Sequence, residues 1–285
     1  MKILAGQTVL LTGASGGLGT FIANAFAERG VKLGLVAFPG SGLEALREAV
    51  EKKGCQALAL ASDLRDSGQR KHVLDRVRKE LGEVDILINN AGVEFTSAYQ
   101  DLEEETIRQM IAINLEAPMV LTRLVLPRML EIGCGHIVNV SSLAGKAGPA
   151  FQEPYSATKA GLIAFTSSLR ASYRGSGVSA SVITPGFVEA GIYSNLKART
   201  GFAAPAVLGT SAPETVPRAV MRAIERDVPE IIINSIPIRP LLVLNLLLPS
   251  LGEWLTHKTG ANAFFGRVAK ALKKVPPTGS GVLPK

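Results

Sequence analysis

The chain alternates short, almost wholly apolar runs with longer amphipathic stretches. The apolar runs predict strands at 8–11, 31–37, 56–60, 84–89, 136–141, 178–184 and 230–233. Between them, hydrophobic residues recur at helical spacing over 17–29, 43–53, 67–81, 101–130, 154–174 and 213–226. Strands that are apolar along their whole length are typical of a parallel sheet with helices on both faces. The pattern therefore predicts an α/β fold built on a doubly wound parallel sheet of about seven strands.

Two regions fall outside this alternation. Residues 187–212 are rich in glycine, alanine and proline without a clear period, which predicts a mobile loop over a site. Residues 236–275 contain two prolines, a leucine-rich stretch, Trp254 and two phenylalanines, which predicts a C-terminal helical appendage. We therefore predict one α/β domain over 1–235, followed by an apolar helical extension and basic tail over 236–285.

Composition excludes several classes of protein. With 47% hydrophobic and 19% charged residues among 285, the chain is globular rather than disordered. Two cysteines, Cys55 and Cys134, are too few for a disulfide scaffold, which favours a reducing compartment and a cytoplasmic protein. No stretch reaches the roughly 18 uninterrupted apolar residues of a transmembrane helix. We predict no metal site.

Charge is unevenly distributed. The chain has 31 basic and 24 acidic residues. The excess lies near the C-terminus, at Arg267, Lys270, Lys273, Lys274 and Lys285. A solvated tail and peripheral contact with anionic lipid through 239–275 are both open interpretations. Because no basic run is interleaved with aromatic residues, we expect no nucleic-acid binding.

A glycine-rich turn follows the first predicted strand and opens the first helix, over Thr12–Gly19. Such a turn lets the backbone approach a ligand closely, and the helix N-terminus favours a pyrophosphate. The same residues match the G-x-S-x-G elbow of a serine hydrolase, with Ser15 as nucleophile. That alternative needs a histidine partner from His72, His136 or His257, none of which lies in a convincing context.

A second candidate site combines Tyr155, Lys159 and Ser142. Residues four apart on a helix share a face, so the ammonium of Lys159 can lie beside the phenol of Tyr155. A nearby cation lowers a phenol pKa toward the range where proton transfer is efficient. Ser142 could then hold a substrate oxygen against the phenol. The set predicts proton transfer to or from an alcohol or carbonyl oxygen.

Several motifs, taken in order, resemble the short-chain dehydrogenase/reductase family over residues 7 to about 235. They are T-G-x-x-x-G-x-G at 12–19, N-N-A-G at 89–92, Asn114, Ser142, Tyr155, Lys159 and P-G at 185–186. The resemblance implies a Rossmann-type NAD(P)-dependent oxidoreductase that moves a hydride between the nicotinamide and a carbonyl or secondary alcohol. A non-catalytic cofactor sensor or scaffold of the same fold is the alternative, although it would not need all four polar residues.

The resemblance also implies residue roles. Tyr155 would be the general acid/base, Lys159 would depress its pKa and bind the nicotinamide ribose, Ser142 would hold the substrate oxygen, and Asn114 would anchor a water. The cofactor would be bound by Gly13, Ser15, Gly16, Gly17, Leu18, Gly19, Ala37, Phe38, Asp63, Leu64, Asn90, Ala91, Gly92, Tyr155, Lys159, Pro185, Gly186 and Val188. Asp63 could instead be an ordinary helix N-cap.

Two departures from the family pattern concern the ligands. The end of the second strand, 36–41, contains neither the acid that selects NAD nor the usual arginine of NADP enzymes, so NADP is only weakly preferred over NAD. After Gly186, the threonine common in the family is absent. The apolar residues that follow suggest a hydrophobic substrate such as a steroid, retinoid or long-chain carbonyl compound. They are Phe187, Ile192, Tyr193, Leu196, Phe202 and Val207. Core packing would give the same set. The resemblance further implies a homo-oligomer through the helices at 101–130 and 154–174.

Overall fold

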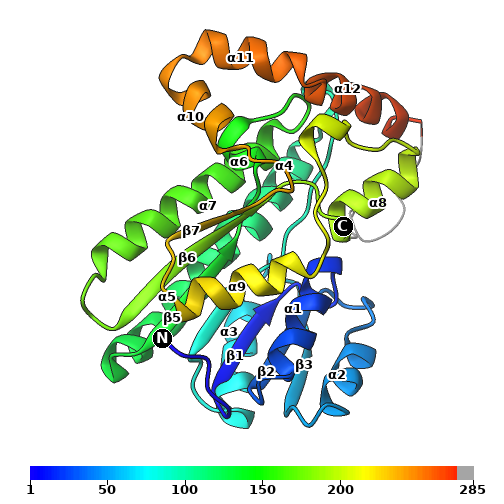
Figure 1. Ribbon diagram of the computed structural model, residues 1–285. Coiled ribbons are helices and arrows are strands. Elements are labelled where there is room, and N and C mark those ends of the chain that lie inside the picture. Colours follow the sequence, from blue (N-terminus) through cyan, green and yellow to red (C-terminus); the bar gives the residue numbers. More distant parts are fainter. Residues whose placement is uncertain (275–285) are drawn as a thin grey trace.

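The computed structural model describes residues 1–274 of the chain. Lys285 and the rest of the predicted basic tail beyond Lys274 lie outside the described residues. One parallel sheet runs through the molecule in the strand order β3-β2-β1-β4-β5-β6-β7 (Figure 1). Its strands are β1 (Thr8–Thr12), β2 (Lys32–Ala37), β3 (Ala57–Ala61), β4 (Ile86–Asn89), β5 (Gly135–Val140), β6 (Val178–Pro185) and β7 (Glu230–Ile233). The predicted strands are confirmed, with ends shifted by one or two residues.

Helices cover both faces of the sheet. On one face, α1 (Gly17–Ala27), α2 (Leu43–Glu51) and α9 (Thr215–Glu225) pack their apolar sides on the strands, with Phe26 and Val220 fully buried. On the other face lie α3 (Ser67–Glu80), α5 (Ala117–Ile132) and α7 (Glu153–Ser172), where Leu74 and Leu121 are buried. The predicted doubly wound α/β fold is therefore confirmed.

The strand order reverses between β1 and β4, which places their following loops side by side. Thr12 at the end of β1 accepts hydrogen bonds at its Oγ1 from the backbone N–H groups of Asn90 and Ala91, both at 3.1 Å. The Asn90 side chain donates in return to the carbonyls of Thr12 and Gly13. In doubly wound sheets, ligands bind in the crevice at such a switch point. The sequence motifs at 12–19 and 89–92 thus lie against each other.

The long helix predicted at 101–130 consists of three parts: α4 (Glu104–Ile111), a π-helical turn η2 (Ala112–Glu116) and α5. A short 3₁₀ turn η1 (Tyr99–Asp101) precedes it. The stretch Glu104–Ile132 is long and apolar enough to cross a bilayer, but half of it is buried. It serves here as a core helix of the sheet. Ile111, Met119 and Ile132 are exposed along it, and the homo-oligomer predicted through this surface stays a prediction.

The prediction of an irregular loop at 187–212 was wrong in part. This segment contains α8 (Gly191–Thr200) and a 3₁₀ turn η3 (Ala206–Leu208). The helix has almost no apolar face, because its residues alternate between cavity, core and solvent contacts, so periodicity did not reveal it. What holds it is the packing of Tyr193 and Leu196 against Phe264 and Phe265.

The C-terminal extension is helical, as predicted. It forms α10 (Arg239–Leu247), α11 (Pro249–Lys258) and α12 (Ala261–Leu272), which lie together at one end of the molecule, above α6 (Ala144–Ala147) and α8 (Figure 1). Phe187 makes ring contacts with Phe264 at 5.7 Å and with Tyr193 at 5.0 Å between centroids. This aromatic cluster ties α12 to the segment after β6. The domain boundary after residue 235 stays a prediction.

Candidate active site

The glycine turn fits closely against two neighbouring segments. Gly13 has a φ of 64°, and a Cβ there would lie 2.7 Å from the Cα of Ala91. A Cβ on Gly17 would lie 2.1 Å from the backbone N of Gly191, and one on Gly19 would lie 2.0 Å from the carbonyl O of Gly13. Side chains at these positions would separate the turn from its neighbours. The glycines are therefore required by contact and not only by conformation.

The N-terminus of α1 has the features of an anion site. Gly16 is its N-cap and supplies no side-chain hydrogen bond, and no acidic residue occupies the first turn. Its first N–H groups therefore lack a side-chain partner, and the helix dipole places partial positive charge there. A pyrophosphate fits this position by charge and by the space that the glycines leave. The residues present thus fit a dinucleotide.

Ser142, Tyr155 and Lys159 come together at the C-terminal end of β5. Tyr155 and Lys159 lie on one face of α7, with the Lys159 Nζ 5.7 Å from the centroid of the Tyr155 ring. The hydroxyl of Ser142 hydrogen-bonds with the phenol of Tyr155. Neighbouring Ser141 points elsewhere and donates to the backbone carbonyl of Lys159 at 2.8 Å. The three predicted side chains therefore form one group.

The pKa of Tyr155 corrects the expectation from sequence. Burial raises the pKa of this phenol well above its ordinary value, the hydrogen bond with Ser142 opposes that rise, and the carboxylate of Glu94 adds to it. Burial also lowers the pKa of Lys159 to about 8. The predicted depression of the phenol pKa by Lys159 was wrong for this state, because burial penalises the charged forms of both groups.

Lys159 is almost fully buried, and its Nζ donates to the carbonyl O of Val140 at 3.0 Å. A Cβ on Gly92 would lie 3.3 Å from this Nζ and 3.4 Å from Oδ1 of Asn114. The glycine of the N-N-A-G motif thus leaves room for the lysine ammonium. This contact links the loop after β4 to the catalytic helix α7.

Asn114 lies in the π-helical turn and is fully buried. Its Oδ1 accepts from the N–H of Val93 at 2.8 Å, and its Nδ2 donates to the carbonyl of Val93 at 2.8 Å and to Thr158 Oγ1 at 3.2 Å. Single π-turns within helices are frequent at functional sites. Here the amide locks the loop after β4 onto α7. Its predicted role as a water anchor stays a prediction.

A cavity of about 630 Å³ contains most of the predicted site. The predicted residues that line it are Gly13, Ser15, Gly16, Gly17, Leu18, Asn90, Ala91, Gly92, Ser142, Tyr155, Lys159, Pro185, Gly186 and Val188. Six predicted residues do not line it, namely Gly19, Ala37, Phe38, Asp63, Leu64 and Asn114. Among these, Gly19 belongs to the turn itself and Asn114 lies behind it.

Asp63 is engaged with Arg65 rather than with the cavity. The carboxylate accepts from the guanidinium of Arg65 at 2.6 to 3.0 Å and from its backbone N–H at 2.9 Å. Burial raises the pKa of Asp63, but the hydrogen bonds from Arg65 outweigh it and leave the pKa below its usual value. The N-cap of α3 is Asp66, whose side chain accepts from Gln69 N at 3.0 Å. The N-cap alternative for Asp63 was therefore wrong.

The far wall of the cavity comes from the C-terminal extension. Leu241 and Leu242 of α10, together with Phe265 of α12, line the same space as the glycine turn and Tyr155. Of the apolar residues after Gly186, those that line the cavity are Phe187, Ile192, Tyr193 and Leu196. Phe202 packs in the aromatic cluster instead, and Val207 is exposed.

Glu94 is a cavity residue that the sequence reasoning missed. It follows Gly92 and Val93 and lines the cavity near Tyr155. Its carboxylate accepts hydrogen bonds from Thr96 Oγ1 and from Gln152 Nε2, the latter at 3.0 Å. Burial raises its pKa, and these hydrogen bonds partly offset the rise. A lone acid in the otherwise apolar stretch after N-N-A-G was the available signal.

The structure does not support the serine hydrolase. Ser15 Oγ donates to Ser41 Oγ at 2.8 Å, beside the glycine turn. His136 is buried and hydrogen-bonds with Ser181 at 2.9 Å. Ser41 also lines the cavity, so the two hydroxyls belong to the dinucleotide side of the site.

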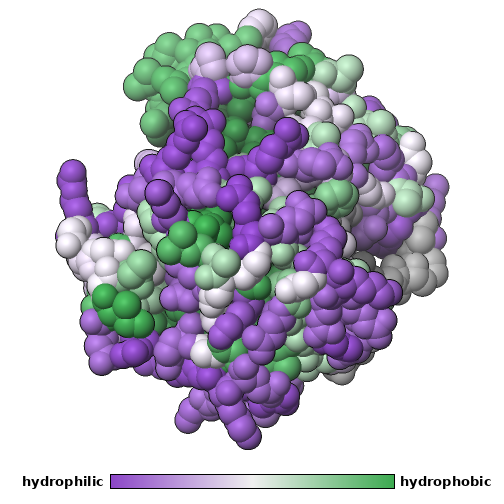
Figure 2. All heavy atoms as spheres, turned by 60° about the horizontal axis from the view of Figure 1, so that its bottom comes forward, coloured by the Kyte–Doolittle hydropathy of each residue, from purple (hydrophilic) through white to green (hydrophobic). Residues whose placement is uncertain are grey.

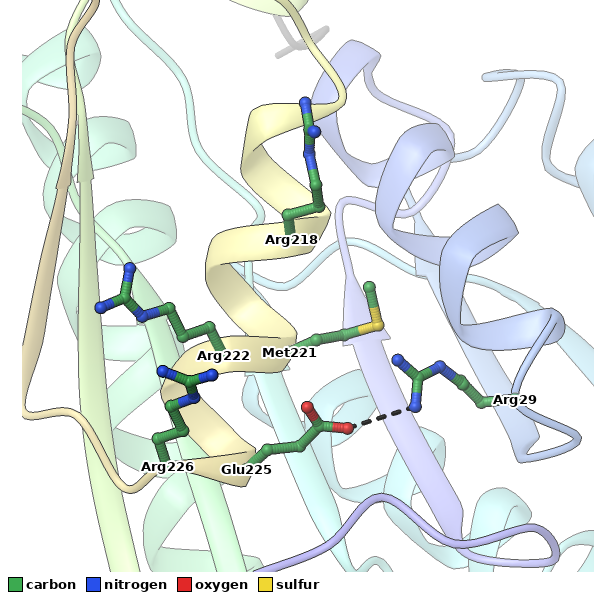
Figure 3. Close-up of a pocket in the computed structure, with 6 residues that line it drawn as sticks. All are labelled: Arg29, Arg218, Met221, Arg222, Glu225 and Arg226. Atoms are coloured by element: carbon green, nitrogen blue, oxygen red, sulfur yellow. Dashed lines mark hydrogen bonds and ion pairs between the residues drawn. The ribbon is translucent and has the colours of Figure 1, made fainter.

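A second cavity of about 360 Å³ lies away from this chemistry, between α1 and α9. Figure 3 shows its lining residues, which are Arg29, Arg218, Met221, Arg222, Glu225 and Arg226. Arg29 and Glu225 form an ion pair at 3.2 Å across it. The arginines are exposed to solvent, and none of the predicted site residues is present. This cavity is a charged surface groove.

Comparison with known proteins agrees with the site. The model of the family described as short chain dehydrogenase matches residues 7–201. The ketoacyl reductase HetN of a Nostoc species is 42% identical over 238 residues, which cover 84% of this chain and 82% of that protein. This chain belongs to the short-chain dehydrogenase/reductase family. It is an NAD(P)-dependent oxidoreductase that acts on CH–OH groups.

Two solved structures share the fold. A metagenomic short-chain oxidoreductase in complex with NADP has a TM-score of 0.69 and 29% identity, covering 81% of this chain and 98% of that one. A variant of actinorhodin polyketide ketoreductase with NADPH has a TM-score of 0.74 and 26% identity, covering 80% and 95%. The coverage of about four fifths extends past the α/β core predicted to bind the dinucleotide.

Proposed function

We propose that this protein is an NADP-preferring reductase of lipophilic carbonyl compounds, with Tyr155 as the general acid. The observation that carries the proposal is the composition of the large cavity. The glycine turn, the Ser142–Tyr155–Lys159 group and the leucines of α10 all line one continuous space. A dinucleotide at the turn and an apolar carbonyl compound against α10 would meet at the phenol.

The chain's own residues manage the proton and the orientation. When bound, the nicotinamide supplies the hydride that the carbonyl carbon accepts. Ser142 donates a hydrogen bond to the carbonyl oxygen, and Tyr155 delivers the proton to that oxygen as its negative charge develops. Lys159, held by the carbonyl of Val140, keeps positive charge next to the resulting phenolate. General acid catalysis of this kind typically contributes about 10²- to 10⁴-fold in rate.

The state of Tyr155 favours the reductive direction. Because burial raises the pKa of this phenol, it carries its proton at neutral pH and begins the cycle as an acid. Dehydrogenation of an alcohol would instead require the phenolate at the start. The carboxylate of Glu94 adds to the same preference. This argument supports carbonyl reduction as the favoured direction.

The preference for NADP rests on the end of β2. Residues 36–41 contain no carboxylate that would bind a ribose 2′-hydroxyl and repel a 2′-phosphate. The hydroxyls of Ser15 and Ser41 meet at this position and can donate hydrogen bonds to phosphate oxygens. The two structural relatives described above were solved with NADP or NADPH. These three observations together favour the phosphorylated dinucleotide.

The substrate is proposed to be a long, apolar carbonyl compound. The cavity wall opposite the dinucleotide is built by Leu241, Leu242 and Phe265. Relatives named ketoacyl reductase and polyketide ketoreductase favour a ketone on an acyl chain over a steroid or retinoid. A cavity of about 630 Å³ has room for such a chain beside the nicotinamide.

A cofactor and substrate panel tests this function. Purified full-length protein is supplied with NADPH or NADH and with ketoacyl compounds of increasing chain length, and dinucleotide oxidation is followed by absorbance. We expect a higher kcat/KM with NADPH, and a kcat/KM that rises with chain length. Equal rates on a short polar ketone and a long-chain ketoacyl compound would refute the substrate class. Binding of NADPH without turnover of any carbonyl would favour the sensor alternative.

A further inference from the structure

The outer faces of α10 and α11 carry a continuous apolar surface, which we call the leucine face. It consists of Val243, Leu246, Leu247, Leu248, Leu251 and Trp254, all of them exposed. Leu246 is 81% exposed and Leu247 is 70% exposed, and within residues 1–274 no side chain of α10 is fully buried. Figure 2 shows apolar atoms gathered at the upper edge, where α10 and α11 lie in Figure 1, above a mostly hydrophilic face.

The spacing of these residues makes the surface one stripe. Val243, Leu246 and Leu247 are three and four apart on α10, and Leu251 and Trp254 are three apart on α11. Leu248 joins the two helices. Clusters of exposed large apolar side chains on a soluble domain mark interaction sites, because their hydration is unfavourable. The leucine face therefore calls for an occupant.

The charge around the leucine face identifies the kind of occupant. Residues 239–274 contain six lysines and arginines against a single acid, Glu253. Arg239 begins α10, and Lys258 ends α11 with its Nζ 5.6 Å from the centroid of the Trp254 ring. An apolar face bordered by cations, with a tryptophan at its edge, matches the headgroup region of an anionic bilayer.

A second copy of the chain fits this surface less well. Two copies meeting through their leucine faces would bring two positively charged regions together, and the whole chain already carries a net charge of +7. An anionic membrane neutralises the same charge. We propose that the leucine face is a docking surface for an anionic lipid bilayer, on which the protein lies peripherally.

The docking surface adjoins the active site. Leu241, Leu242 and Asn245 on the inner side of α10 line the large cavity, whereas Leu246 and Leu247 on its outer side do not. A bilayer against the outer side would therefore lie one helix away from the substrate space. The docking proposal concerns binding alone and does not depend on the proposed reductase activity.

Trp254 makes the proposal directly measurable, because it is the only tryptophan in the chain. The full-length protein is mixed with vesicles of phosphatidylcholine alone or of phosphatidylcholine with phosphatidylserine. We expect cosedimentation with the anionic vesicles, a blue shift of Trp254 emission, and quenching by lipids brominated in the upper acyl chain. Raising the salt concentration should weaken binding, because surface charge attraction is screened.

Two variants with matched chemistry separate the leucine face from general apolar exposure. Leu246→Ser with Leu247→Ser should lower the vesicle partition coefficient by roughly tenfold per leucine, given the free energy of burying a leucine side chain. Leu4→Ser with Ile132→Ser, which changes exposed residues outside the appendage, should leave it unchanged. Both variants should retain the wild-type circular dichroism spectrum and rate on a water-soluble ketone.

Three outcomes would overturn the proposal. One is equal binding to neutral and anionic vesicles, or binding to neither. Another is an equal loss of vesicle binding in both variants. The third is a decrease in oligomer size for the Leu246→Ser/Leu247→Ser variant, measured by sedimentation without vesicles, together with unchanged vesicle binding. That result would make the leucine face a contact between copies of the chain.

Discussion

Replacing Lys159 by methionine should make the protein more stable at neutral pH while abolishing its activity. Burial lowers the pKa of Lys159 to about 8, from an ordinary value of 10.5. The unfolded chain therefore binds this proton more tightly than the folded protein. Keeping the buried ammonium charged costs about 3.4 kcal/mol of folding free energy below pH 8, at 1.36 kcal/mol for each pH unit.

Part of that gain is lost with the side chain's contacts. The Nζ of Lys159 donates to the carbonyl of Val140, and removal of one partner of a buried hydrogen bond costs about 1 to 3 kcal/mol. Methionine has a similar length and fills the space of the aliphatic stem. The net expectation for Lys159→Met is a rise of about 1 to 2 kcal/mol in the free energy of unfolding at pH 7.

The pH dependence gives the sign of the effect. A lysine whose folded pKa lies below its unfolded pKa destabilises the folded state fully at low pH, and this penalty disappears as the pH rises from about 8 to 10.5. The advantage of the variant should thus be largest at pH 7 and should fall, or reverse, by pH 10. Tyr155 is present in both proteins, so its titration affects the comparison only through its contact with Lys159.

Urea unfolding followed by circular dichroism, without added dinucleotide, measures this difference at pH 7 and pH 10. Lys79→Met is the matched control, since Lys79 lies exposed on α3, and its change should stay within about 0.5 kcal/mol. If Lys159→Met were less stable than the wild type by the same amount at both pH values, the buried lysine would not carry the proposed desolvation cost.

Three further changes test the turn, the cavity wall and the aromatic cluster. Gly19→Ala should raise the dissociation constant for NADPH at least tenfold in a fluorescence titration, because its Cβ would lie 2.0 Å from a backbone oxygen, whereas Gly16→Ala, with its nearest atom at 3.3 Å, should have a smaller effect. Glu94→Gln should raise kcat/KM about tenfold for carbonyl substrates that carry a carboxylate and leave neutral substrates unchanged, since it removes a like charge; an equal effect on both would contradict a selective role. Phe264→Ala should cost about 3 to 5 kcal/mol in urea unfolding, because Phe264 is fully buried where α8, α12 and the loop after β6 meet.

Much of the fold could be predicted because its signals are local. The strands are buried on both faces, so their apolar runs are continuous, and the glycine turn and N-N-A-G motif follow strands that the sheet order brings together. The helix α8 was missed because its stability comes from contacts with α12, some seventy residues later in the chain. Propensity and period carry no information about such contacts.

The site was predictable in its members but not in its electrostatics. Ser142, Tyr155 and Lys159 follow from spacing on one helix and one strand end, and these are local properties. The direction of the Tyr155 pKa depends on how completely the phenol is buried and on the nearby carboxylate of Glu94, and both result from tertiary packing. The same applies to Leu241, whose place in the cavity wall depends on how α10 folds back over the sheet.

The role of Tyr155 as proton donor is the centre of this account, and single-turnover reduction of a long-chain ketoacyl compound by the preformed NADPH complex tests it most directly. The account predicts that Tyr155→Phe lowers the rate of the hydride-transfer step by about 10²- to 10⁴-fold, while the dissociation constant for NADPH changes little. It also predicts that the wild-type rate is lower in D₂O. A Tyr155→Phe variant that reduces the substrate at nearly the wild-type rate would contradict it.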